Sequence, residues 1–381
     1  MNRAGFLGAA GSTLAAATQP TLPAFTPTLR IAVVCPQSGV DAQIGRQLIG
    51  GVHAAVDYIN NNRSSFDRAL LYEFYDDRNT AADAVVQASF ATGNPDTWAT
   101  IGHLSAAATL AALPTYNSAQ MPLIVPTVTD DRVTNQGYRN VFRLPTKDSD
   151  EGGLLAQYAI AGGAKAPHVM TMDADYGPVV ADGFVRRASA MKVVVAETKI
   201  SAAKPDFNSA VADAIVHVPD CIAFAGNVDE MGPLLPLLRE RGYTGRFIAS
   251  QGFFDGTTVA KYPKESDGMV VSSAVPYYPL APTAQNDLSD YTARYGPITP
   301  VAAYGYAAVQ LIYLAQRRSG ATSRPLITRA ISTGGAFDTV TGSYTFGANG
   351  DPFDPNCYFY AIKGGKFVYE RQAHRSGFMM R

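Results

Sequence analysis

Apolar residues follow two alternating patterns along the first third of the chain. Continuous runs rich in β-branched residues, such as Leu29 to Cys35, predict strands that are covered on both faces. Between these runs, apolar positions recur at helical spacing, as from Ile44 to Ile59, and predict helices with one buried face. Strand and helix alternate up to the run Pro122 to Val125. This order predicts an α/β fold with a doubly wound parallel sheet.

The same alternation begins again after Pro145 and indicates a second lobe of similar architecture. We expect helices at 150–161, 176–191, 206–216 and 230–241, and strands at 167–172, 193–197, 221–225 and 246–250. The remaining chain adds a strand at 269–274, long helices at 300–317 and 326–333, and short strands at 342–346 and 358–363. Two similar lobes predict a cleft between them, where small ligands commonly bind.

The stretch Ile101 to Thr129 is the strongest candidate for a binding site. Gly102 ends a strand, and the small residues from Ser105 onward open a helix that ends before Pro114 or continues to Ala119. A helix that starts directly after a strand presents free N–H groups at the edge of the sheet where ligands bind. The alternative is that these small residues only allow the helix to pack closely on the sheet.

The composition excludes several partners. At 381 residues the chain exceeds one ordinary core, and a formal net charge of −1 without basic stripes argues against nucleic acid and anionic membranes. Residues 1–27 have one arginine, a weakly apolar Ala/Gly-rich run and a Pro-rich end, which predict an export signal and lead-in. A disordered tail is the alternative. Arg3 to Leu7 resembles a twin-arginine signal, but Ala4 replaces the second arginine and leaves the export route open.

Motifs for catalysis are missing from the sequence. It has no G-x-S-x-G, no H-E-x-x-H, no phosphate loop ending in Gly-Lys-Ser/Thr, and no G-x-G-x-x-G after the first strand. The five histidines lack metal-ligand spacing, and Cys35, Cys221 and Cys357 are far apart within or beside apolar runs. We therefore expect no enzyme, no cofactor and no metal, and three buried cysteines.

Taken in order, the motifs resemble the leucine-binding family of type I periplasmic binding proteins, the solute receptors of ABC importers. The resemblance runs from Leu29 to Lys366. It is carried by the first strand with Ser38-Gly39, the helix ending Ile59-Asn60, Tyr75-Asp76-Asp77, Ile101-Gly102-His103-Leu104, Pro126-Thr127-Val128-Thr129, Val141-Phe142-Arg143, Asp175-Tyr176-Gly177, the run Ala225 to Gly232, and Arg239 to Gly245.

The resemblance implies two lobes that close over a ligand about a three-segment hinge. Lobe 1 would comprise residues 28–142 and 276–346, and lobe 2 residues 146–272 and 351–381, with crossovers near 142–145, 272–276 and 346–351. It also implies a monomer in the periplasm that recognises a small molecule and a membrane permease, without inserting into the membrane itself. A ligand-sensing module of a signalling system is the alternative from another class.

The resemblance assigns ligand contacts residue by residue, and two of them depart from the amino-acid-binding pattern. Ala106 lacks the expected hydroxyl, and Gln251 replaces the carboxylate that would hold an ammonium group. A buried ammonium without a counter-charge is costly. We therefore expect a ligand less polar than an amino acid, such as an aromatic acid, an amide or a lipid-like molecule, with branched-chain or other amino acids as the alternative.

The full set of expected ligand contacts combines the first-lobe helix start, the second-lobe strand ends and apolar cover. It consists of Ser105, Ala106, Ala107, Thr127, Thr129, Tyr176, Asn227, Gln251, Ile44 and Phe253, with Phe254, Tyr277 and Tyr278 as further apolar lining. His103 is expected to be a structural histidine. Asp76 and Asp77 are expected to cap a helix and support the rim of the cleft rather than bind metal.

Overall fold

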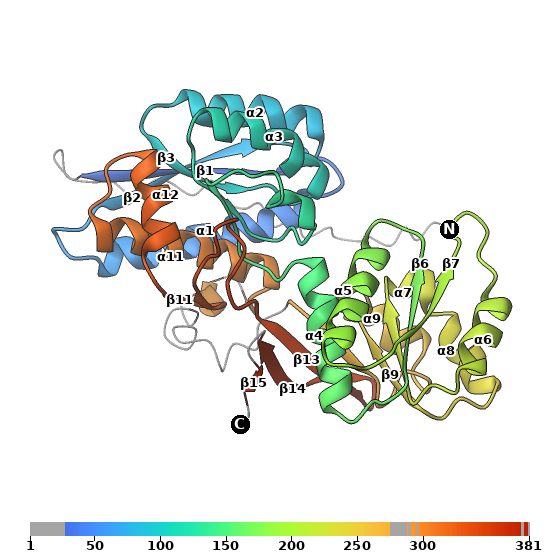
Figure 1. The fold of residues 1–381 in the computed structure, drawn as a ribbon. Helices are drawn as coiled ribbons and strands as arrows, with labels where there is room; N and C mark the ends of the chain where they lie inside the picture. The colour runs from blue at the N-terminus through green and yellow to red at the C-terminus, as the bar shows by residue number, and fades with distance from the viewer. Residues whose placement is uncertain (1–26, 275–287, 289–290, 295, 375–376, 380–381) are drawn as a thin grey trace, which may run out of the picture.

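The structure is a computed structural model that describes residues 27–274, 288, 291–294, 296–374 and 377–379. Its elements form two α/β bodies, each built around its own sheet (Figure 1). The expected export signal, Tyr277 and Tyr278 lie outside the described residues, as do residues 275–276 of the crossover expected at 272–276.

The first sheet has five parallel strands in the order β2-β1-β3-β4-β5. Their bounds are β1 Thr28–Cys35, β2 Ala69–Asp76, β3 Thr97–Gly102, β4 Leu123–Val125 and β5 Val141–Arg143. On β1, Ile31 and Val33 belong to one core cluster while Ala32 and Val34 belong to another. Both faces of this strand are therefore buried, as the continuous apolar run predicted.

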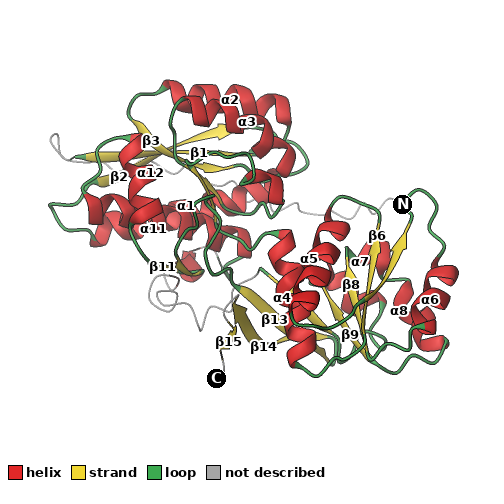
Figure 2. Ribbon diagram, in the orientation of Figure 1, coloured by secondary structure: helices red, strands yellow, loops and turns green. Residues whose placement is uncertain are grey.

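Helices cover both faces of the first sheet (Figure 2). They are α1 Ala42–Asn62, α2 Ala81–Gly93, α3 Ala106–Ser118, α11 Pro300–Ser319 and α12 Arg324–Thr333. Helix α1 packs against α11 on one face, and α2 packs against α3 on the other. Helix α3 continues past Pro114 to Ser118, which decides between the two predicted ends.

The second sheet has eight strands in the order β15-β14-β13-β10-β9-β8-β6-β7, of which β10 to β7 run parallel. The bounds are β6 Pro167–Met172, β7 Ala196–Ile200, β8 Cys221–Ala225, β9 Arg246–Ala249, β10 Val270–Ser273, β13 Cys357–Lys363, β14 Lys366–His374 and β15 Gly377–Met379. A separate hairpin joins β11 Phe337–Thr339 to β12 Gly342–Tyr344. Parallel lobes of this kind confirm the predicted fold class.

Helices α4 and α5 cover one face of the second sheet, and α6 and α8 cover the other. The bounds are α4 Asp148–Ala161, α5 Tyr176–Ala190, α6 Phe207–Val216, α7 Val228–Met231, α8 Leu234–Glu240 and α9 Gly256–Lys261. Helices α4 and α5 touch through glycine: a Cβ on Gly152 would lie 1.9 Å from the Val180 carbonyl oxygen. This close contact fixes the start of α5 relative to the start of α4.

Two segments that join the bodies are bonded to each other. The fully buried Arg143 guanidinium donates from Nε to Asp351 Oδ1 at 3.0 Å and from Nη2 to Thr134 Oγ1 at 2.7 Å. The Arg143 N–H also donates to the Gly350 carbonyl oxygen. The connection from β5 to α4 and the one from β12 to β13 therefore lie side by side.

The structure contains β11, β15 and α9, which were not predicted, and it differs from the sequence-based elements at three further places. The helix expected at 230–241 is split into α7 and α8, because Pro233 has no N–H to continue the helical ladder. The strand expected at 193–197 begins at Ala196, since Val194 is exposed. Strand β14 was not predicted, although Gly364 and Gly365, both at positive φ, form the tight turn of its hairpin with β13.

Candidate functional site

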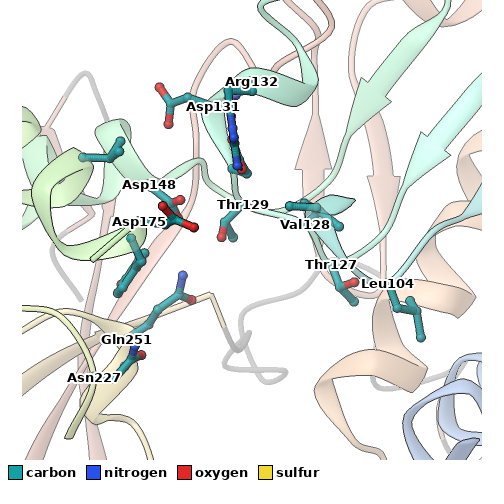
Figure 3. A pocket seen from close by; sticks show the side chains of 15 residues that line it. Leu104, Thr127, Val128, Thr129, Asp131, Arg132, Asp148, Asp175, Asn227 and Gln251 are labelled. Carbon is teal, nitrogen blue, oxygen red and sulfur yellow. Dashed lines mark hydrogen bonds and ion pairs between the residues drawn. The ribbon is translucent and has the colours of Figure 1, made fainter. Parts of the chain in front are cut away.

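A cavity of about 670 Å³ lies between the two bodies and is lined by residues from both. Figure 3 shows Leu104 and Thr127 on the side of the first sheet, and Asn227 and Gln251 on the side of the second. The lining residues are Leu104, Ala106, Thr127, Val128, Thr129, Asp130, Asp131, Arg132, Asp148, Asp175, Tyr176, Val179, Asn227, Gln251 and Gly252.

The first side of the cavity is formed by the start of α3 and the loop after β4. Ser105 is the N-cap of α3, and its hydroxyl accepts from the Ala108 N–H at 3.3 Å. The next residue, Ala106, lines the cavity. Thr127 lies beside it, and its buried Oγ1 has no hydrogen-bond partner within the described part of the chain. This side therefore offers a helix N-terminus and one hydroxyl to a ligand.

The second side is organised by a carboxylate that lies behind the cavity wall. Glu151 Oε1 accepts from the Gln251 N–H and from Ser272 Oγ, both at 2.6 Å, and Oε2 accepts from the Tyr176 hydroxyl at 2.7 Å. Burial raises the pKa of Glu151, although these three hydrogen bonds oppose the shift. One side chain thus fixes the start of α5, the turn after β9 and strand β10.

Acidic side chains dominate the charge of the cavity. Asp148, at the start of α4, is 6% exposed, and burial raises its pKa to about 7; Thr129 opposes this shift by a hydrogen bond, while Glu151 and Asp131 add to it. The Asp130 carboxylate is paired with the Arg132 guanidinium. Asp175 also lines the cavity and lies near Asp148 (Figure 3).

The structure brings together part of the expected contact set. Ala106, Thr127, Thr129, Tyr176, Asn227 and Gln251 line the cavity. Ser105 and Ala107 are not among the lining residues, because Ser105 caps α3 and Ala107 is exposed on the outside of its first turn. Tyr176 lines the cavity, and its hydroxyl donates to Glu151.

Three apolar contacts expected from the sequence are not among the residues that line the cavity. Phe253 is fully buried in the core of the second body, where its ring stacks on Phe224, and so it does not reach the cavity. Phe254 packs against Tyr360 and Phe367 instead of lining the crevice. Ile44 is 43% exposed on α1 and is not among the lining residues.

Asp148 and Glu151 were missed by sequence reasoning. The pattern Lys147-Asp148-Ser149-Asp150-Glu151 reads as the acidic first turn of a helix, which is common at any helix start. The Glu151 partners Gln251 and Ser272 lie 100 and 121 residues further along the chain. No local signal in the sequence marks these two carboxylates as different from Asp150.

Other polar residues near the strand ends have structural roles. His103 is buried, and its ring nitrogens contact Asp77 Oδ2 at 2.5 Å and the Tyr116 hydroxyl at 3.0 Å, as expected of a structural histidine. The N-cap of α2 is Thr80. Asp76 and Asp77 therefore do not cap that helix, and their carboxylates instead bind groups in the neighbouring turns. All three cysteines are free and buried, as predicted.

The cavity has carboxylates, hydroxyls and an amide, but the described residues include no group of three or more His, Cys, Asp or Glu side chains able to hold a metal ion. No helix among them is long and apolar enough to cross a membrane. A polar cavity between two α/β bodies is an arrangement that suits the binding of a small solute.

Comparison with known proteins identifies the family. The profile described as periplasmic binding protein matches residues 28–366, and the chain belongs to this family, in its leucine-binding type I branch. Members are solute-binding proteins of ABC transporters rather than enzymes, in agreement with the missing catalytic motifs. The family implies an extracytoplasmic location.

Individual relatives are distant but cover most of the chain. The leucine-specific-binding protein of Salmonella typhimurium is 26% identical over 334 residues, which is 85% of this chain and 88% of that protein. A putative branched-chain amino acid ABC transporter structure from Rhodospirillum rubrum gives a TM-score of 0.81 at 21% identity and covers 90% of this chain and all of the other. The structure of a solute-binding protein from R. palustris in complex with benzoate gives a TM-score of 0.68 at 21% identity. The match covers 93% of this chain and 98% of the other.

Proposed function

We propose that the protein captures one small organic solute in the cavity between its two bodies and delivers it to the permease of an ABC importer. The observation that carries this proposal is a single cavity of about 670 Å³ whose lining comes from the start of α3 on one side and the start of α5 on the other. A ligand in this position contacts both bodies at once and stabilises a closed arrangement.

The ligand in this proposal has an apolar body and one strongly polar end, and is less polar than a simple amino acid. Leu104, Val128 and Val179 give the cavity apolar surface, and Tyr176 adds an aromatic ring. Gln251 supplies an amide where amino-acid-binding relatives would supply a carboxylate, and Ala106 supplies no hydroxyl. These replacements weaken both anchors of a zwitterion placed in the usual way.

Closure would take place about the segments that connect the bodies. Two of these segments, near 142–145 and 346–351, are held together by the Arg143–Asp351 pair, so they would bend as one unit. We propose lobe 1 as residues 28–142 with 276–346, lobe 2 as 146–272 with 351–381, and a monomeric receptor. X-ray scattering should show a smaller radius of gyration with ligand at an unchanged molecular mass.

A thermal-shift screen tests the ligand class, because a ligand that binds only the folded protein raises the melting temperature. The screen compares leucine and phenylalanine with amides, amines and acids that carry the same branched or phenyl body. We expect one or more of the less polar compounds to stabilise the protein by about 2.7 kcal/mol at a hundredfold excess over Kd. Micromolar binding of α-amino acids alone would contradict the proposed ligand class.

A further inference from the structure

Arg132 is the one basic side chain among the described residues that line the cavity. Its Nε donates to both carboxylate oxygens of Asp130 at 3.0 Å, and its Nη2 also donates to Asp130. Its Nη1 forms no hydrogen bond or ion pair with any residue that the structure describes. A guanidinium can bind a carboxylate along each of two edges, so Arg132 can keep Asp130 on one edge and bind a second carboxylate on the other.

The loop that carries Arg132 is held at the connection between the two bodies. Arg143 Nη1 donates to the carbonyl oxygen of Asp130 at 2.8 Å, and Asp131 Oδ1 accepts from the Ser149 N–H at 3.0 Å. The two residues before Arg132 are therefore fixed, whereas the side chain of Arg132 is 62% exposed. Rotation of this side chain alone can turn its unused edge toward the second body.

Asp175 lines the same cavity from the second body, directly before α5 (Figure 3). It is exposed and occupies the N-cap position, but its side chain does not cap the helix. Its carboxylate forms no hydrogen bond or ion pair within the described part of the chain. Asp131, by contrast, binds Ser149 and lies 3.8 Å from Lys147 Nζ. Asp175 is therefore the exposed carboxylate of the cavity that has no partner among these residues.

Arg132 and Asp175 influence each other although no ion pair joins them in this structure. Hydrogen bonding to Asp130 and the charge of Asp130 raise the pKa of the Arg132 guanidinium, burial opposes this shift, and the charge of Asp175 adds to it. Asp130 and Asp175 carry the same charge, so they would repel each other if the bodies approached without a cation between them. A guanidinium between the two carboxylates makes the same approach favourable.

We propose that Arg132 and Asp175 are positioning residues of the solute site: when the two bodies close over a solute, the unused edge of the Arg132 guanidinium pairs with the Asp175 carboxylate and holds the bodies together. Neither side chain needs to contact the solute. This inference rests on the proposed function, because it names the contact that stabilises the closed arrangement of the same receptor.

Titration calorimetry tests the pair with leucine, phenylalanine, benzoate, 4-methylpentanamide and 3-phenylpropanamide as probes. Kd is measured for each probe with the wild-type protein, Arg132→Gln, Asp175→Asn and the double variant. Asp173→Asn is the matched control, because Asp173 is exposed two residues before Asp175 and is not among the lining residues. The two amides carry no charge, so a change in their Kd is not a direct electrostatic effect on the probe. Urea denaturation without probe checks that each variant is folded.

For the probes that bind the wild type, Asp175→Asn should weaken binding by at least about threefold, and Arg132→Gln should weaken it more, because it leaves Asp130 facing Asp175. In the Arg132→Gln protein, the same Asp175→Asn change should instead tighten binding by at least about twofold, since it removes one of two like charges. A purely structural role of either residue would not produce this reversal of sign. Asp173→Asn should stay within about 1.5-fold of the wild type.

Salt gives a second measurement on the same proteins. Raising the ionic strength from about 0.02 M to about 0.5 M should reduce the difference in Kd between the wild type and Asp175→Asn, because salt screens a pair at the edge of a cavity. A difference that is independent of salt would contradict a charge interaction between Arg132 and Asp175.

The outcomes separate this inference from the proposed function. Unchanged affinity in Asp175→Asn, an equal loss in Asp173→Asn, or the same effect of Asp175→Asn with and without Arg132 overturns the pair and leaves the solute receptor intact. Binding of α-amino acids alone contradicts the proposed ligand class but still tests the pair, because the pair does not contact the solute. Failure of all five probes to bind the wild type overturns both.

Discussion

The hydroxyl of Tyr176 donates to Glu151 Oε2 at 2.7 Å, behind the wall of the cavity. The phenol is thereby tied to the second body, and burial together with the negative charge of Glu151 raises its pKa. The aromatic ring, rather than the hydroxyl, is the part of Tyr176 that the cavity offers to a ligand. This assignment differs from the usual expectation for a tyrosine at a binding site.

Two substitutions of Tyr176 test the contributions of its ring and its hydroxyl separately. Tyr176→Phe keeps the ring, so ligand affinity should change by less than about threefold, whereas Tyr176→Ala removes the aromatic cover and should cost about 2 kcal/mol of binding. Calorimetry with the tightest-binding probe of the screen measures both. If the phenylalanine variant binds as poorly as the alanine variant, the hydroxyl contacts the ligand directly and the assignment is wrong.

Glu151 should control the stability of the second body. Glu151→Ala leaves the Gln251 N–H, the Ser272 hydroxyl and the Tyr176 hydroxyl without their acceptor, and we expect a loss of about 3 kcal/mol in the free energy of unfolding. Glu151→Gln retains an oxygen that can accept from Gln251 and Ser272, so its loss should be smaller. Urea denaturation measures both variants. Equal losses would contradict this expectation, because they would show that an amide of the same size cannot replace the carboxylate in these hydrogen bonds.

Strand and helix patterns were readable in the sequence because parallel strands are buried on both faces. β1 and β8 each place alternate residues in two different core clusters, and each appears in the sequence as an unbroken apolar run. Strand β14 was missed because it lies near the edge of the sheet with a mixed sequence, Lys366–His374, of which only Ala373 and Gln372 are buried. Such a strand depends on its neighbour for its conformation.

The binding residues were only partly predictable, for a related reason. Ala106 and Thr127 follow strand ends directly, so the local pattern locates them. Phe253 was expected in the cavity because it follows Gln251 closely, but the short helical turn Gln251–Phe253 points its ring into the core. Glu151 acquires its role only when α4 packs against β9 and β10, and Asp148 only when the start of α4 meets Thr129, and no single stretch of sequence encodes either contact.

The contact between α4 and α5 can be tested with neighbouring glycines. A Cβ on Gly152 would lie 1.9 Å from the Val180 carbonyl oxygen, whereas one on Gly153 would be 3.6 Å from Arg187 Cβ, an ordinary distance. Gly152→Ala should therefore lower the free energy of unfolding by about 2 kcal/mol or more, through overpacking. Gly153→Ala should be neutral or stabilise by up to about 1 kcal/mol, because alanine favours a helix. Urea denaturation measures the free energy of unfolding of both variants. Similar values would contradict the close contact between Gly152 and Val180.

The Arg143–Asp351 pair should hold the connecting segments together. Burial alone would raise the pKa of Asp351, but Arg143, Thr134 and Lys147 outweigh it and lower the pKa, so the carboxylate is charged in the folded protein. Asp351→Asn leaves the buried Arg143 without its counter-charge and should cost about 3 to 5 kcal/mol. Asp338→Asn, at an exposed position, is the control and should have almost no effect. A loss below about 1 kcal/mol for Asp351→Asn would contradict this role.

Asp148 predicts an unusual dependence of stability on pH in the ligand-free protein. Its pKa is raised from 3.8 to about 7, first by burial and then by Glu151 and Asp131, against the opposing effects of Thr129 and Arg143. A carboxyl group with a raised pKa holds its proton more strongly when folded. Its ionisation therefore destabilises the folded state progressively as the pH rises from the unfolded pKa to the folded one, and the full penalty is present above both.

Asp148→Asn removes this ionisation and should stabilise the ligand-free protein more at about pH 8 than at about pH 5, by a difference on the order of 2 kcal/mol. Asp150→Asn, in the same helical turn, is the matched control. Urea denaturation of the three proteins at both pH values measures the difference directly. A variant that gains equally at both values, or that is less stable at the higher one, would mean that Asp148 is charged and compensated in the folded protein. A gain in the stability of Asp148→Asn that is larger at the higher pH would identify a carboxylate whose ionisation lowers the stability of the ligand-free protein.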